Sequence, residues 1–413
     1  MAVPALESLV DPALSAQLVA WILAGIVLGC CSGLVPGLHA NNFALLLAGV
    51  APSVPGPPLF VGCAMLAAGV VHTFVNAVPA MALGVPDAEM AITALPAHRM
   101  VLDGRGFEAI RLSALGSILA VLAAIPLALP ITWSVTAVYP TIRSNLSLVL
   151  AMIVVALIAS ERTWKRCAGA LLAFGLATAL GVLTLDFDPN SPLEAGGMLA
   201  PLFAGLFGAP VLIEAIRGGG VPPQHDDEIR MPRRLVGITA LAGSFAGAVV
   251  GYIPGISAAI AAVAVLVFVP GESDNRGYIV ATSGVDTSNS IFALFALVSL
   301  GQPRTGVMIA FDNANAPLDV PVLLLSILLA GVAGFVLVIW IGDVYLEFVG
   351  RLAYWKISVV VLGLLLVLSY LFTGVVGVGV FVVAAAIGMV PVRLRTRRVH
   401  LMGVLIGPLM IGI

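Results

Sequence analysis

Polar side chains interrupt an apolar run in the second half of the chain. The run extends from Tyr278 to Leu300, and the segment Ser283–Ser290 within it carries a carboxylate, an amide and several hydroxyls. Asp286 stands near the middle, where an ionised aspartate costs roughly 2.5–3.5 kcal/mol in a membrane helix. Such an oxygen set suits Na⁺ or proton transfer; the alternative is a polar network between helices. The predicted coupling-ion residues are Asp286, Thr287, Ser288 and Asn289.

A second kind of chemistry is expected where proline-glycine pairs break apolar segments. Two such breaks, Pro36-Gly37 and Pro254-Gly255, occupy corresponding places in the two halves of the chain, and each is followed by polar residues. A helix that begins after a break offers free N–H groups and the positive end of its dipole, which suits a carboxylate or another anion. The alternative is a simple turn between helices. The predicted substrate-binding residues at the breaks are Pro36, Gly37, His39, Asn41, Asn42, Pro254, Gly255 and Ser257.

A polar patch in the first half corresponds to the Asp286 segment. Val71-His72-Thr73 with Asn76 aligns with Val285-Asp286-Thr287 with Asn289. A lone histidine in a membrane helix is commonly a hydrogen-bonding residue of the core, but the alignment with Asp286 favours a role in the site. We therefore predict that His72, Thr73 and Asn76 bind substrate.

These correspondences belong to an internal repeat. Three matched pairs, Pro36/Pro254, Thr73/Thr287 and Pro86/Pro303, are separated by 218, 214 and 217 residues. Ordered matches at a nearly constant offset indicate duplication. Paired broken helices at the interface of two repeats commonly mark the binding site of a transporter.

The composition predicts that these residues lie in a membrane. Of 413 residues, 61% are hydrophobic and 10% are charged, and the mean hydropathy is +1.13. A soluble domain carries about 25% charged residues, and a net charge of −2 offers no basic surface for nucleic acid. We expect an all-α polytopic protein of the cell membrane, with about 12–14 transmembrane or re-entrant segments and broken helices. Spans are predicted near residues 15–34, 57–83, 107–131, 144–160, 167–185, 197–216, 235–253, 278–300, 318–341, 356–374, 375–391 and 399–413, with shorter stretches at 38–51 and 257–269.

The basic residues predict the topology. The first repeat is residues 1–216 and the second is residues 235–413, joined by a cytoplasmic linker at 217–234. With an odd number of segments in each, the repeats would have opposite orientations. Seventeen of the 19 Lys and Arg residues then fall on one side, and only Arg143 and Arg304 fall on the other. Since basic loops are cytoplasmic, both termini are predicted to lie outside the cytoplasm.

Motifs of soluble enzymes are missing from the sequence. It contains no Walker A loop, no G-x-S-x-G elbow and no HExxH. The four cysteines show neither metal spacing nor the pattern of a disulfide framework. We therefore predict that the protein is not an enzyme and uses no cofactor, and no metal beyond Na⁺.

Several segments resemble the large permease subunit of tripartite tricarboxylate transporters, the TctA family. Gly25–Leu38 is similar to a glycine-rich helix that enters a P-G-L turn in that family, and Met100–Ile110 to its segment around Leu-Asp-Gly. Gly205–Gly208 with Glu214 and the closing His400–Pro408 also resemble the family. Residues 285–289 differ from the usual Glu- and Asn-rich stretch, a divergence that resembles archaeal branches of the family.

The resemblance implies a permease for tricarboxylates that works with a small membrane subunit and an extracytoplasmic binding protein. With the residues above, we predict a secondary transporter of organic anions, in particular carboxylates, driven by Na⁺ or H⁺. Two alternatives stay open. One is a carrier of polyprenyl phosphate or another lipid anion, since Pro-Gly re-entrant repeats also occur in such carriers. The other is an intramembrane enzyme that uses Asp286 with His72 or His39. The sequence does not decide the oligomeric state, and a homodimer is one option.

Overall fold

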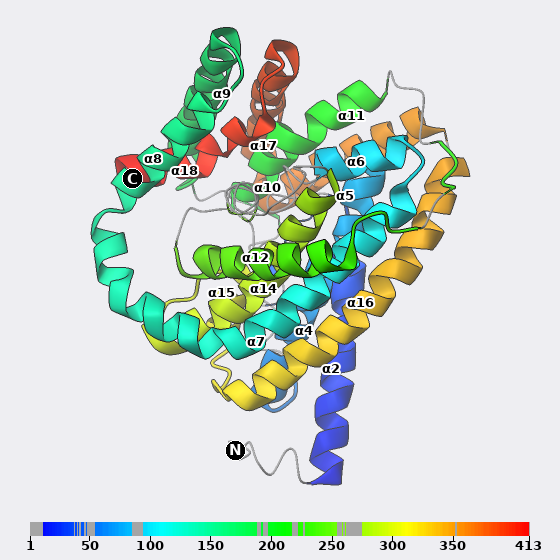
Figure 1. Ribbon diagram of the computed structural model, residues 1–413, viewed down its shortest axis with the longest axis vertical. Helices are drawn as coiled ribbons and strands as arrows, with labels where there is room; N and C mark the ends of the chain where they lie inside the picture. Colours follow the sequence, from blue (N-terminus) through cyan, green and yellow to red (C-terminus); the bar gives the residue numbers. More distant parts are fainter. Residues whose placement is uncertain are drawn as a thin grey trace.

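The computed structural model is helical, with no strand in the part of the chain that it describes (Figure 1). The described residues are 11–36, 38, 40, 43–44, 47, 54–84, 94–187, 191–192, 197–216, 222–225, 228–253, 258, 261, 275–351 and 353–412. The helices in chain order are α2 (Pro12–Gly33), α4 (Pro58–Val75), α5 (Ala77–Leu83), α6 (Ala94–Leu102), α7 (Gly106–Ser144), α8 (Leu146–Ala159), α9 (Trp164–Thr184), α10 (Leu199–Phe203), the π-helix η2 (Ala204–Gly208), α11 (Ala209–Ala215), α12 (Arg233–Tyr252), α14 (Asn275–Leu300), α15 (Gly306–Asn313), α16 (Val320–Arg351), α17 (Tyr354–Leu394), the 3₁₀-helix η3 (Arg398–Met402) and α18 (Gly403–Ile411).

Eight helical segments of the described chain are long and apolar enough to cross a membrane. They are α2, α4 with α5, α7, α9, α12, α14, α16 and α17, and the shorter apolar helices lie at Leu146–Ala159, Leu199–Glu214 and Arg398–Ile411. The predicted all-α polytopic membrane fold is thereby confirmed, and each predicted span falls on a described helix. The shorter stretches 38–51 and 257–269 lie largely outside the described residues.

Three helices differ in length from the predicted spans, and one of them, α16, continues to Arg351 instead of ending near residue 341. The 39 residues of α7 continue through Pro126, Pro130 and Pro140 instead of ending near residue 131. Proline is tolerated in membrane helices where neighbouring groups satisfy the freed carbonyls. In α17 the helix is broken at Gly374, which has φ 63° and ψ −160°, a conformation that favours glycine. This break coincides with the predicted boundary between the spans 356–374 and 375–391.

Close glycine contacts join α2 to α4 and α12 to α14 in the same manner. A Cβ on Gly25 would lie 2.2 Å from the carbonyl oxygen of Ala64, and a Cβ on Gly243 would lie 2.7 Å from that of Ala281. The contact recurs one and two turns later in each pair, at Gly29, Gly33, Gly247 and Gly251. Because the partner residues advance along the chain as well, the two helices of each pair run in the same direction. Small residues at helix interfaces allow this close approach in membranes.

The helix α16 runs parallel to α4. Near the start of both helices, the Ser326 hydroxyl donates a hydrogen bond of 2.8 Å to the carbonyl oxygen of Cys63. Further along both, Gly334 packs against the ring of Phe74. The helix α16 therefore has the direction of α4, and hence that of α2.

The helix α7 runs parallel to α14 and antiparallel to α16. Glu108, in the first turn of α7, bonds to Arg276 near the start of α14, and Ser117 meets Thr287 further along. Against α16 the order is reversed, since the early residue Ile110 of α7 packs on Gly342 near the end of α16. It follows that α2, α4 and α16 run in one direction and that α7, α12 and α14 run in the other.

The two helices that carry the polar patches are the most deeply buried spans of the described chain. The α4–α5 segment packs against α2 and α16, and α14 packs against α7 and α12. In Figure 1, α4 and α14 lie among these neighbours, while α8, α9 and α18 lie on the opposite side of the molecule from the beginning of α2. The polar patches are therefore enclosed by protein, where irregular hydrogen bonding is tolerated in a membrane.

Candidate functional site

The polar patches of α4 and α14 meet inside the bundle. The hydroxyl oxygens of Thr73 and Thr287 lie 3.4 Å apart, and these two residues align with each other when the two halves of the sequence are compared. Both side chains are buried, as are His72 and Asp286, which directly precede them. The structure thus brings the predicted substrate-binding patch of the first half into contact with the predicted coupling-ion patch of the second.

His72 is fully buried beside the last turn of α2. Its Nδ1 lies 2.9 Å from Oγ of Ser32, and its ring stacks on Phe43 with centroids 5.8 Å apart and 10° between the planes. The Ser32 hydroxyl also lies 3.1 Å from the carbonyl oxygen of Gly29, to which it can donate its single proton while it accepts from Nδ1 of His72.

Two serines of α7 line the contact between the patches. Oγ of Ser117 lies 2.9 Å from Oγ1 of Thr287 and 3.1 Å from the carbonyl oxygen of Ser283. Oγ of Ser113 lies 2.8 Å from Oγ of Ser283. Neither α7 serine belongs to the predicted site. Their spacing of four residues puts both on one face of an apolar helix, and this is the sequence signal that identifies them.

Ser288 and Asn289 face α12 instead of α7. The Ser288 hydroxyl donates to the carbonyl four residues earlier at 2.6 Å and lies against Gly247, where a Cβ would come within 2.1 Å of Oγ. Oδ1 of Asn289 lies beside Gly251 and has no hydrogen-bond partner among the described residues. Successive residues of an α-helix point about 100° apart. The hydroxyls of Thr287 and Ser288 are accordingly directed to different neighbours and not to one common point.

Two further predicted residues are described. Asn76 is buried between α4 and α5, and its backbone N–H donates to the carbonyl oxygen of His72 at 2.9 Å. Pro36 lies in the turn that follows α2.

Within the described ranges, no group of three or more His, Cys, Asp or Glu residues could hold a metal ion. The other predicted residues lie outside the described part of the chain: Gly37, His39, Asn41, Asn42, Pro254, Gly255 and Ser257.

Comparison with known proteins assigns the chain to a family. The model of the tripartite tricarboxylate transporter TctA family matches residues 19–403. This chain belongs to the TctA family. It is 28% identical over 408 residues to the uncharacterized protein MJ1079 of Methanocaldococcus jannaschii, an alignment that covers 94% of this chain and 97% of that protein. This similarity agrees with a divergent, archaeal-type member of the TctA family. No solved structure matches the chain.

Membership in the TctA family indicates the class of protein in which the buried contact between α4 and α14 occurs. The family consists of transporters and not of enzymes, and the eight apolar helices fit a multi-pass membrane protein. The chain is therefore a permease of the tricarboxylate-transporter type. Ionisable residues buried within membrane segments commonly mark the path of a substrate or an ion.

A buried carboxylate at the beginning of α7 joins three segments of this TctA-family chain. Glu108 is fully buried and accepts hydrogen bonds from Nε of Arg276 at 2.8 Å and from the backbone N–H of Arg230 at 2.9 Å. It also forms an ion pair with Arg105. Close by, the N–H of Gly106 donates to Oε1 of Gln224 at 2.6 Å. The segment between the two halves is thus bound to α7 and α14.

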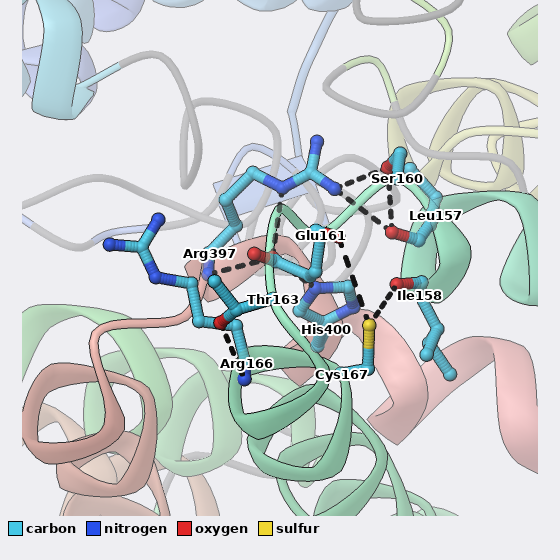
Figure 2. Close-up of polar contacts among 9 residues, drawn as sticks. All are labelled: Leu157, Ile158, Ser160, Glu161, Thr163, Arg166, Cys167, Arg397 and His400. Atoms are coloured by element: carbon cyan, nitrogen blue, oxygen red, sulfur yellow. Dashed lines mark hydrogen bonds and ion pairs between the residues drawn. The ribbon is translucent and has the colours of Figure 1, made fainter.

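A second charged cluster ties the turn between α8 and α9 to Arg397, which follows α17, and to His400 in η3 (Figure 2). Oε1 of Glu161 lies 2.9 Å from Nε2 of His400 and 3.0 Å from Nε of Arg397. Nη2 of Arg397 also donates to the carbonyl oxygen of Leu157 at 2.9 Å. Burial alone would raise the pKa of Glu161, but the hydrogen bonds from His400 and Arg397 outweigh it and lower this pKa below its ordinary value. The carboxylate therefore holds the two segments together in its charged form.

Proposed function

We propose that this chain is a secondary transporter of organic anions, in particular carboxylates, driven by a gradient of Na⁺ or H⁺. The observation that carries the proposal is the contact between Thr73 and Thr287, which joins the His72 and Asp286 patches at the buried centre. Asp286 would bind the coupling cation or carry the proton, since a carboxylate deep in an apolar helix is costly unless an ion or a partner compensates it. Thr287, Ser288 and Asn289 would supply further oxygens as the helices move.

The helix directions support an inverted relation between the halves 1–216 and 235–413. The pair α2–α4 runs opposite to the equivalent pair α12–α14, and α7 runs opposite to α16. Repeats of opposite orientation, with a site at their interface, suit alternating access. With the basic loops in the cytoplasm, both termini would lie outside it.

Substrate would be held next to the two Pro-Gly breaks. The first patch supports this assignment, because His72 and Asn76 adjoin Gly33 in the last turn before the first break. In the second half, Asn289 adjoins Gly251 in the last turn before the second break. The N–H groups after each break would then bind the carboxylate, with His39, Asn41, Asn42 and Ser257 as orienting side chains. The tripartite family further suggests a small membrane subunit and an extracytoplasmic binding protein as partners.

The proposal is tested by uptake of labelled citrate and succinate into proteoliposomes that contain the purified chain. We expect accumulation above the external concentration only when an inward Na⁺ or proton gradient is imposed. Equal uptake with and without every gradient would refute ion coupling. Movement of a labelled polyprenyl phosphate without any uptake of either carboxylate would show that the substrate class is wrong.

A further inference from the structure

Arg304 lies just beyond the end of α14 and is held in place by neutral groups. Its Nη2 donates to Oε1 of Gln302 at 2.7 Å and to the phenol oxygen of Tyr139 near the end of α7. The guanidinium carbon lies 5.4 Å from the centroid of the Tyr139 ring, a cation–π distance. Tyr139 itself is buried. The guanidinium is therefore fixed in position at the junction of α7 and α14.

Arg304 differs from the other arginines that lie within the helical body. Arg105 and Arg276 pair with Glu108, and Arg111 pairs with Asp343. Arg304 has no carboxylate partner in the described part of the chain, and its buried Nε has no hydrogen-bond partner there. Because a guanidinium stays protonated in proteins, this position keeps a full positive charge that its immobilised neighbours do not neutralise.

The position of Arg304 along the bundle is opposite to that of the Glu108 cluster. α7 and α14 are parallel, and their first turns meet at Glu108 and Arg276. The 26 residues of α14 span about 39 Å at 1.5 Å per residue, so Arg304 lies on the far side of a bilayer core of about 30 Å. Under the proposed topology this is the extracytoplasmic side, which Arg304 shares with Arg143.

We propose that Arg304 forms an extracytoplasmic binding site for a carboxylate of the substrate, positioned for this by Tyr139 and Gln302. This inference rests on the proposed function. A fixed guanidinium without a carboxylate partner can exchange its solvent for a carboxylate, with which it forms charge-assisted, often bidentate hydrogen bonds. Binding here would raise the local concentration of anion at the end of α14, the helix that carries Asp286.

The test is equilibrium binding of labelled citrate to the purified chain in nanodiscs at low ionic strength. We expect Arg304→Gln to raise the Kd about tenfold or more, the effect of losing one hydrogen bond to a charged group. Arg143→Gln is the matched control, since it removes one positive charge from the exposed end of α7 on the same side. It should leave the Kd within about twofold, because exposed charges are screened and contribute little.

Two more variants separate binding from structure. Arg304→Lys keeps the charge but loses the planar fork, so an intermediate Kd is expected. Tyr139→Phe removes the phenol and should raise the Kd while the thermal midpoint stays close to that of the wild type. An unchanged Kd for Arg304→Gln, or equal increases for Arg304→Gln and Arg143→Gln, would overturn the inference. If the wild type neither binds nor transports citrate and succinate, the proposed function fails and the inference fails with it.

Discussion

Glu108 offers a sharp test of the packing, because its carboxylate is fully buried while its partners are not. The side chains of Arg105 and Arg276 are 17% and 20% exposed, against 0% for Glu108. Removal of one member of a fully buried ion pair costs about 3–5 kcal/mol. Since both arginines reach solvent, part of this cost is relieved, and we expect Glu108→Gln to lower the free energy of unfolding by about 2–4 kcal/mol.

The measurement is equilibrium unfolding of the purified chain in mixed detergent micelles. Asp343→Asn is the matched control, because it neutralises a carboxylate that also pairs with an arginine, Arg111, but whose side chain is 33% exposed. Its cost should stay below about 1 kcal/mol. If Glu108→Gln were no less stable than Asp343→Asn, Glu108 would not clamp α7, α14 and the connecting segment, and the argument from burial would be wrong.

The other stability predictions concern the α9–α18 contact and the Glu161 cluster. A Cβ on Gly181 would lie 2.0 Å from the carbonyl oxygen of Val404, whereas nothing described lies within 4 Å of one on Gly175. Gly181→Ala should therefore lower the unfolding free energy by about 1–3 kcal/mol and Gly175→Ala should not; equal midpoints for the two would contradict this packing. The lowered pKa of Glu161 means that its stabilising effect is present above the unfolded-state value of 4.5 and is lost as the pH falls through the lower folded value. The difference in melting temperature between wild type and Glu161→Gln should thus be largest near pH 7 and shrink toward pH 3, and a difference independent of pH would refute the assignment.

Much of the bundle could be predicted because its determinants are local in the sequence. Apolar runs of spanning length follow from the bilayer thickness, whereas the duplication inferred from three matched pairs stays a prediction. The alignment of the two patches predicts that Thr73 and Thr287 lie near each other, but it gives no distance between their side chains. The length of α7 was not predictable, because proline ends most soluble helices, and only the packing around Pro126 and Pro130 decides whether a membrane helix continues.

The details of the site depend on contacts between distant residues. Ser117 meets Thr287 across 170 positions of sequence, and nothing near either residue specifies the other. Whether Thr287 or Ser288 turns toward α12 depends on the rotation of α14, which the glycines of α12 determine from outside the helix. Glu108 was likewise missed, since an acidic residue in the first turn of a helix usually serves the helix dipole on the surface.

The most direct test of the central claim is gradient-driven uptake by Asp286→Asn in proteoliposomes. The substitution keeps the shape of the side chain and removes its charge, and Asp312→Asn at the exposed end of α15 is the matched control. We predict that Asp286→Asn folds and inserts normally but no longer accumulates labelled carboxylate in response to Na⁺ or H⁺, while Asp312→Asn behaves like the wild type. Accumulation by Asp286→Asn at the wild-type rate and with the wild-type ion dependence would contradict the assignment of the coupling site to the contact between α4 and α14.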